Sequence, residues 1–262
     1  MKVHNLARNN PGLWMEGIPT QEMLSREILQ FCSLYDVNSF LIAAEDSQSF
    51  IIKSHPAAEI YAITPNVSRY VREMTIHGQT KTALKIILRM GINGLALTII
   101  KCVRNLPQLL QKDFRVMLSL LISIELQELR HQKPKIVFLH NQITDLALAN
   151  NNKEIILAFI NALKKSCAEP GLITMNLEQL VKKIEEWGIH ISHIGAPFNY
   201  RGYAMRSSQT KCADIVQKGD RKYYAICGAR KGTLTKEISY AQKINVERLF
   251  IALRKEPCAG IS

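Results

Sequence analysis

Apolar, strand-like stretches alternate with helix-like stretches through the second half of the chain. Short runs rich in β-branched and aromatic residues predict strands at 135–140, 171–176, 190–199, 222–230 and 247–254. Apolar residues spaced three or four apart predict the helices between them, at 153–167, 177–188, 209–218 and 236–245. Strands that alternate with helices of this length are typical of parallel βα units.

The first half of the chain continues this alternation less regularly. Apolar runs at 12–18, 38–44 and 59–66 predict three more strands, and a helix is expected from Thr20 to about Tyr35. Three strands added to five give eight, the number that closes a parallel sheet into a (βα)8 barrel. We therefore predict an α/β, TIM-like barrel that forms a single domain over residues 1–262, with an open doubly wound parallel sheet as the alternative.

One long segment, 68–133, interrupts the alternation because it contains no convincing strand. Its patterns predict several helices, including a long one at 113–132 that Asp113 could cap. A crossover between two parallel strands needs only one helix, so we expect a helical insertion or an extended βα excursion between the third and fourth strands. The segment holds eleven Lys and Arg against four Asp and Glu, a surplus of seven out of the chain's net charge of +12.

This positive charge bears on the choice of partner. Lys and Arg are dispersed and no nucleic-acid recognition module is recognisable, so nucleic acid is not an expected partner. Within the insertion, the apolar runs MGINGLALTII and VMLSLLISI adjoin basic residues, a pattern that allows contact with an anionic membrane surface. The same apolar faces could instead pack on the barrel or on a second subunit, which would make the protein a homodimer.

The cysteines and the start of the chain predict a cytoplasmic protein. The six cysteines form no CxxC pair and no iron–sulfur spacing, so we expect free thiols, with Cys102 and Cys227 buried in apolar runs. The sequence MKVHNLARNN has no apolar stretch after its charges and is not expected to be a signal peptide. The longest nearly uncharged run, 90–100, is too short to cross a bilayer.

Several stretches resemble a family of prokaryotic proteins that have no assigned activity and are thought to be TIM-barrel-like. These stretches are ITPNVSRYVRE, LLQKDFRVMLSLLISIE, KIVFLHNQITDLALANNN, AEPGLITMN and IGAPFNYRGYAM, which together span roughly residues 60–250. The resemblance implies the barrel fold and implies no catalytic residue.

In a parallel barrel the active site lies at the carboxyl ends of the strands. The last polar residues of the eight expected strands are Glu16, Glu45, Asn66, His140, Asn176, Asn199, Arg230 and Arg254. Alternation along a strand gives three sets that could all point inward and converge at the mouth of the barrel. These sets are Ile136, Phe138 and His140; Leu172, Thr174 and Asn176; and Ile226, Gly228 and Arg230.

His140 is the strongest candidate for a catalytic residue. It stands where an apolar strand meets polar residues, and an imidazole titrates near neutral pH and can carry protons. A structural histidine at a strand end is the alternative reading. Glu45 is a second acid–base candidate, although EDS at 45–47 also suits an exposed turn. No metal site is predicted, because His190 and His193 are three residues apart and face opposite sides of a strand.

Arginine and asparagine side chains are the candidates for binding the substrate. Arg230 in GARKGT and Arg254 in LRKEP follow the last two strands, where barrels that use phosphate often bind it. Arg201 in NYRGY could pair with a carboxylate, and the candidates for orienting a carbonyl or hydroxyl are Asn66, Asn176 and Asn199.

These features predict an enzyme that acts on a small anionic metabolite, for example a phosphorylated one, by lyase or isomerase chemistry. Neither a GxGxxG fingerprint nor a GxSxG elbow occurs, and no lysine ends the sixth strand to form a Schiff base. The sequence identifies no cofactor. The alternative function is that of a peripheral membrane or lipid-associated barrel that uses its basic helical insertion.

Overall fold

The eight strands form a closed parallel barrel. A computed structural model describes residues 12–14, 32–44, 56–72, 75, 114–164, 166–229 and 233–253. The strands are β1 (Gly12–Trp14), β2 (Ser39–Ala43), β3 (Glu59–Thr64), β4 (Ile136–Leu139), β5 (Glu169–Ile173), β6 (His193–Ala196), β7 (Lys222–Ala229) and β8 (Arg248–Leu253). Each strand pairs with the next in the chain, and β1 also pairs with β8. The predicted barrel is confirmed and the open sheet is wrong.

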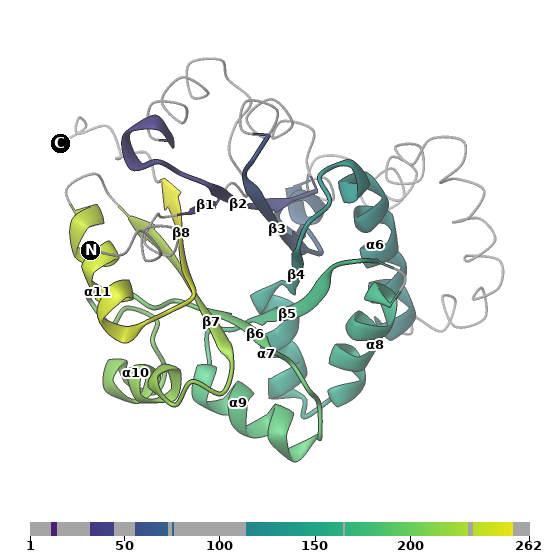
Figure 1. Cartoon of the computed structure of the whole chain (residues 1–262). Helices are drawn as coiled ribbons and strands as arrows, with labels where there is room; N and C mark the ends of the chain where they lie inside the picture. The colour runs from purple at the N-terminus through teal and green to yellow at the C-terminus, as the bar shows by residue number, and fades with distance from the viewer. Residues whose placement is uncertain are drawn as a thin grey trace.

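The described helices lie outside the ring of strands (Figure 1). The labelled helices are α6 (Phe114–Glu128), α7 (Asn141–Ala149), α8 (Lys153–Leu163), α9 (Leu177–Glu186), α10 (Gln209–Gln217) and α11 (Leu234–Ile244), with a short 3-10 turn, η3 (Leu129–His131), after α6. Residues 32–35 and 67–72 are also helical. Two helices, α7 and α8, connect β4 to β5. Only the second was predicted; no helix was expected in the polar residues directly after His140.

The inside of the barrel is filled by large apolar and aromatic side chains. These residues are Leu41, Tyr61, Ile63, Ile136, Phe138, Ile173, Tyr224, Ile226 and Phe250. The Phe138 and Tyr224 rings meet edge to face with centroids 5.3 Å apart, and the Tyr61 and Phe250 rings do so at 5.1 Å. The barrel is therefore a packed core rather than a channel, as is usual for eight strands.

Strand β5 faces the opposite way from the prediction. Leu172 packs in the outer core between sheet and helices, whereas Ile173 packs inside the barrel. A β-carbon on Gly171 would lie 2.5 Å from Cδ1 of Phe138, so the absence of a side chain at Gly171 makes room for that ring. The inward set is thus Gly171 and Ile173, and the expectation that Leu172 and Thr174 point inward is wrong. The predicted inward direction of Ile136, Phe138 and Ile226 is confirmed.

A network of polar side chains lies at the amino end of the barrel. Arg248 donates to Glu59 at 2.8 Å and to the side chain of Asn38 at 2.7 Å. The His193 ring lies 2.7 Å from a carboxylate oxygen of Glu169 and 2.9 Å from the Tyr224 hydroxyl. A carboxylate only accepts, so Nε2 of His193 carries a proton in this arrangement. These contacts join the starts of neighbouring strands, and this end of a barrel usually serves stability.

Helix α6 belongs to the segment predicted as a helical insertion, and its apolar face is largely covered. Leu118, Ile122 and Ile124 are buried, and α6 packs against α8. In the run VMLSLLISI, most apolar side chains therefore pack inside the molecule. Met117 is the exception, at 42% exposed. Within the part of the chain that the structure describes, no helix has the length and apolar character needed to cross a membrane.

Candidate active site at the carboxyl end of the barrel

The described part of the carboxyl rim is built by the ends of β2 to β6 and the loops that follow them. Among the predicted site residues, it includes Asn66, His140, Asn176, Asn199 and Arg201. Glu16, Glu45, Arg230 and Arg254 lie outside the described residues.

His140 lies between the end of β4 and the first residue of helix α7, at the N-cap position of that helix. It is 8% exposed, and its Nδ1 atom accepts a hydrogen bond from the backbone N–H of Gln142 at 3.2 Å. The imidazole therefore caps the helix, a task usually done by Ser, Thr, Asp or Asn. Because the backbone amide can only donate, Nδ1 is the acceptor and the ring proton lies on Nε2. The backbone N–H of His140 donates to the carbonyl of Thr64 at 2.9 Å, which fixes His140 against the end of β3.

Asp145, one turn into α7, connects this helix to the end of β5. Its carboxylate accepts from the hydroxyl of Thr174 at 2.5 Å and from the backbone N–H of Met175 at 3.1 Å. Thr174 also accepts from the backbone N–H of Asn176. Asn176 occupies the N-cap position of α9, without a capping bond from its side chain. The Asp145 contacts thus hold the rim at β5 in a fixed position relative to the helix that His140 begins.

Asn199 holds the shape of the loop that follows β6. Its amide nitrogen donates to the carbonyls of Pro197 and Tyr203, and its amide oxygen accepts from the backbone N–H groups of Arg201 and Tyr203. Both ends of this buried amide are therefore engaged within its own loop, which is a structural role.

Two further side chains support the same loop from the helices below it. Gln209 of α10 donates to the carbonyls of Asn199 and Tyr200, and Glu237 of α11 accepts the backbone N–H of Tyr200 at 3.1 Å. Glu237 is 4% exposed, and burial raises the pKa of its carboxyl group. The loop is thus held by its own Asn199 and by side chains from α10 and α11.

Arg201 and Lys236 gather around the ring of Tyr200. The guanidinium carbon of Arg201 lies 5.3 Å from the ring centroid, and the Lys236 ammonium lies 5.7 Å from it. Arg201 also donates from Nε to the Tyr200 hydroxyl at 2.7 Å. Two positive charges thus lie on one aromatic ring, and Arg201 also interacts electrostatically with the carboxyl group of Glu237.

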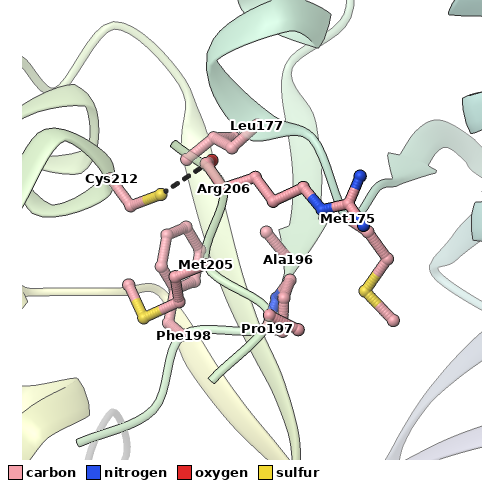
Figure 2. Close-up of a pocket in the computed structure, with 9 residues that line it drawn as sticks. Met175, Leu177, Ala196, Pro197, Phe198, Met205, Arg206 and Cys212 are labelled. Atoms are coloured by element: carbon pink, nitrogen blue, oxygen red, sulfur yellow. Dashed lines mark hydrogen bonds between the residues drawn. The ribbon is translucent and has the colours of Figure 1, made fainter. Parts of the chain in front are cut away.

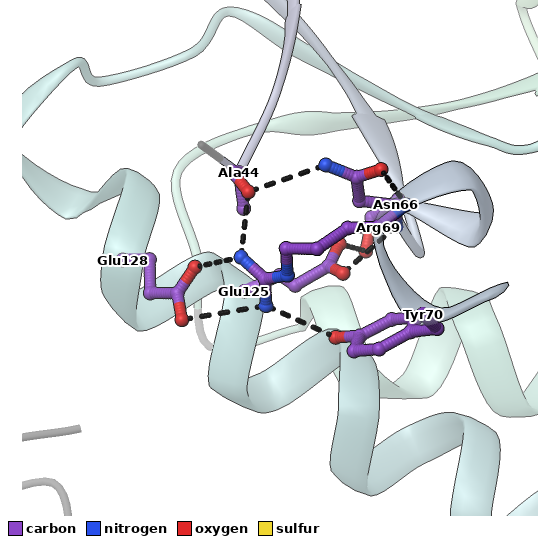
Figure 3. Close-up of polar contacts among 7 residues, drawn as sticks. Ala44, Asn66, Arg69, Tyr70, Glu125 and Glu128 are labelled. Atoms are coloured by element: carbon purple, nitrogen blue, oxygen red, sulfur yellow. Dashed lines mark hydrogen bonds and ion pairs between the residues drawn. The ribbon is translucent and has the colours of Figure 1, made fainter. Parts of the chain in front are cut away.

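A buried ionic cluster lies at the ends of β2 and β3 against helix α6 (Figure 3). Arg69 is 2% exposed and donates to Glu128 at 2.7 Å and to the carbonyl of Ala44 at 2.6 Å. Asn66 donates from its side chain to the same carbonyl at 3.3 Å and accepts from the backbone N–H of Arg69. The Asn66 side chain is therefore part of the framework that joins these strands to α6.

Glu125 is the most enclosed charged residue of this cluster. It is fully buried and accepts from the Thr64 hydroxyl at 2.7 Å and from the backbone N–H of Asn66 at 2.8 Å. Burial raises the pKa of its carboxyl group, against the opposing effect of these hydrogen bonds and of Arg69. Thr64 belongs both to this cluster and, through its carbonyl, to the fixation of His140.

Little in the sequence indicates this cluster. Arg69 and Glu128 are 59 residues apart, and no motif connects them. The one signal is Glu125 itself, a carboxylate within the apolar helical run LLISIEL, since a charged residue on an apolar face is usually paired.

The hollow next to the β6 loop is small and apolar (Figure 2). It is lined by Met175, Leu177, Ala196, Pro197, Phe198, Ala204, Met205, Arg206 and Cys212. It is too narrow to enclose a water molecule. In this conformation it therefore provides no ligand cavity.

The buried thiols are poor nucleophiles. Burial raises the pKa of Cys212 to about 11 and that of Cys227 to about 12. Both are free, and Cys227 is buried as predicted, whereas Cys102 lies outside the described residues. Over the described ranges, no three His, Cys, Asp or Glu side chains gather as metal ligands. His193, the first residue of β6, is buried, and His190, which precedes the strand, is exposed.

The fold defines the class of protein: the chain is an α/β barrel of the TIM type, with its candidate site at the carboxyl rim. No protein-family model matches the chain, and no curated protein matches it significantly.

Proposed function

We propose that the protein is an enzyme that acts on a small anionic metabolite by proton transfer, in a lyase- or isomerase-type reaction. His140 is the proton carrier. Arg230 and Arg254 bind the anionic group, and Arg201 contributes from the β6 loop. Lyase and isomerase reactions need little more than an acid–base group and a means of stabilising negative charge.

The observation that carries the proposal is the position and bonding of His140. Ile136 and Phe138 point into the barrel, and His140 follows them at the same two-residue interval, which supports a position at the mouth. Its cap bond to Gln142 assigns the ring proton to Nε2, the atom that would donate to a substrate oxygen or receive a proton from carbon. The contacts of Thr64 and Asp145 keep this residue and its helix in place.

The substrate-binding part of the proposal depends on the arginines. Asn66 and Asn199 are engaged in holding their own surroundings, so the proposal assigns no substrate contact to them. Asn176 and Glu45 stay predicted members of the site. The helical insertion has no separate function in this proposal.

Proton exchange in heavy water tests the proposal even though the substrate is unidentified. Pools of anionic metabolites are incubated with the protein in D2O, and loss of a carbon-bound proton signal is followed by NMR. We expect exchange in one or more compounds, loss of this exchange in His140→Gln, and unchanged exchange in His190→Gln, which alters an exposed histidine away from the rim. Exchange that persists in His140→Gln would show that another residue moves the proton.

Arg230→Ala tests the binding half separately. We expect it to weaken binding of the exchanging compound at least tenfold, because a charge-assisted contact to an anion is lost. The matched control is Lys243→Ala, which removes one exposed positive charge from the far end of α11. Equal binding by both variants would remove Arg230 from the site.

A further inference from the structure

A single buried carboxylate, that of Glu125, reaches from helix α6 to the end of β3 (Figure 3). One of its oxygens accepts from the Thr64 hydroxyl at 2.7 Å, and the other accepts from the backbone N–H of Asn66 at 2.8 Å. Glu125 and Thr64 are both 0% exposed, and Asn66 is 1% exposed. Both carboxylate oxygens are therefore used to fix the chain where β3 ends.

The end of β3 is in turn bonded to the residue proposed as the proton carrier. The carbonyl of Thr64 accepts from the backbone N–H of His140 at 2.9 Å, directly after the last paired position of β4, Leu139. A displacement of Thr64 would therefore displace the backbone of His140. The ring would move with it, and its cap bond to the N–H of Gln142, already 3.2 Å long, would be weakened.

The contacts of Glu125 fit the carboxylate and not the isosteric amide. Besides Thr64 and Asn66, the Tyr70 hydroxyl donates to it, and Arg69 adds a favourable charge. A carboxylate only accepts, whereas an amide presents one donor and one acceptor, so a glutamine would turn an N–H towards one of these donors. Glu125→Gln is therefore enough to disturb the end of β3 without changing the size of the side chain.

We propose that Glu125 is a positioning residue for His140 and acts through the Thr64 hydroxyl to hold the imidazole in its reactive place. The inference rests on the function proposed for His140 and adds to it a residue from a helix outside the barrel. Because Glu125 is fully buried, it does not touch the substrate. A purely structural role would lower stability and leave His140 unchanged in the folded protein.

NMR of the His140 ring tests the proposal without any substrate. In protein labelled with 15N-histidine, long-range 1H–15N spectra distinguish a ring nitrogen that carries a proton from one that accepts, and His140→Gln assigns the signals. In the unchanged protein we expect the proton on Nε2. Thr64→Val and Glu125→Gln should convert this single tautomer into a mixture, whereas Thr64→Ser, which keeps the hydroxyl, should largely restore it.

Ile184→Val is the control for a loss of stability alone. Ile184 is buried in the last turn of α9 and has no part in the contacts between α6, β3 and β4 described above. The variant should unfold at lower urea concentration and give the His140 signals of the unchanged protein. Circular dichroism confirms that each variant is folded under the conditions of the NMR experiment, and Thr64→Val decides if Glu125→Gln does not fold.

The proton exchange in heavy water supplies the kinetic readout. Thr64→Val and Glu125→Gln should lower kcat at least about tenfold and leave KM within about twofold, because His140 is displaced while the groups that bind the substrate are not. If the unchanged protein exchanges no proton, the proposed function fails, and the ring signals alone decide about Glu125. The positioning role is overturned if both variants give the His140 signals of the unchanged protein, or if Ile184→Val alters these signals equally.

Discussion

Replacing Arg69 by methionine tests whether the buried cluster is a structural joint between the barrel and helix α6. The change removes a charge and keeps a long, unbranched side chain. It breaks the contact with Glu128 at 2.7 Å and that with the carbonyl of Ala44 at 2.6 Å. Removing one partner of a buried ion pair costs about 3–5 kcal/mol. Because the Glu128 side chain is 21% exposed and can be partly hydrated, we expect a loss of about 2–4 kcal/mol in the free energy of unfolding.

The cost should depend on pH because of Glu125. Burial raises the pKa of this carboxyl group above its unfolded value, so the stability it contributes is present at low pH and is lost as pH rises through the folded pKa. Arg69 lowers that pKa, and removing the arginine therefore raises it further. The substitution should consequently cost less in acid, where Glu125 is neutral, than above neutral pH.

Urea unfolding followed by circular dichroism, repeated at a series of pH values from acid to alkaline, measures both effects. Arg130→Met is the matched control, because Arg130 is exposed at the end of the same helical segment and should change stability by less than about 0.5 kcal/mol. A loss in Arg69→Met below about 1 kcal/mol, or a loss that stays the same across the whole pH series, would refute the reasoning.

Three further predictions concern the barrel and its rim. Gly171→Ala should lower the free energy of unfolding in urea by about 1–3 kcal/mol, since its β-carbon would lie 2.5 Å from the Phe138 ring, and adding Phe138→Leu should recover part of this loss. His140→Ala should cost about 1 kcal/mol more stability than His140→Asn, which can still cap α7, and both should abolish the proton exchange. Hydrogen bonding to His193 lowers the pKa of Glu169, so the stability that Glu169 contributes is present above its unfolded pKa and is lost as pH falls through the folded pKa. Glu169→Gln should therefore make the free energy of unfolding less dependent on pH in acid. The effect should be less than about 1 kcal/mol, because the Glu169 side chain is 59% exposed.

Much of the fold was predictable because the order of βα units is local information. Strands such as β4 and β7 appear as apolar runs, and helices such as α9 show the amphipathic spacing directly. The facing of β5 was not predictable in the same way. Its strand is buried on both sides, so apolar residues occur at both parities and no alternation marks the inward face. The choice is made by the space that Phe138 needs beside Gly171.

The site was predictable as a location and less so as a set of contacts. The sequence predicted His140 at a strand end, and the structure has it there. Its role as the cap of α7 was not predictable, because it depends on the backbone N–H of Gln142 pointing at the imidazole. Asn199 was expected to face a substrate, and the structure uses its amide to hold a turn. The pairing of Arg69 with Glu128 arises from the return of a distant helix to the strand ends. Such contacts follow from the assembled fold.

In the β6 loop, the residues that hold the backbone differ from those whose side chains lie outside this frame, and this separation affects which positions can be substituted. Asn199, Gln209 and Glu237 determine the backbone path from within, while Tyr200, Arg201 and Tyr203 take no part in that frame through their side chains. Substitutions at these outer positions should therefore change the surface of the loop without unfolding the turn. These positions are thus expected to tolerate substitution, and they are suitable targets for saturation mutagenesis.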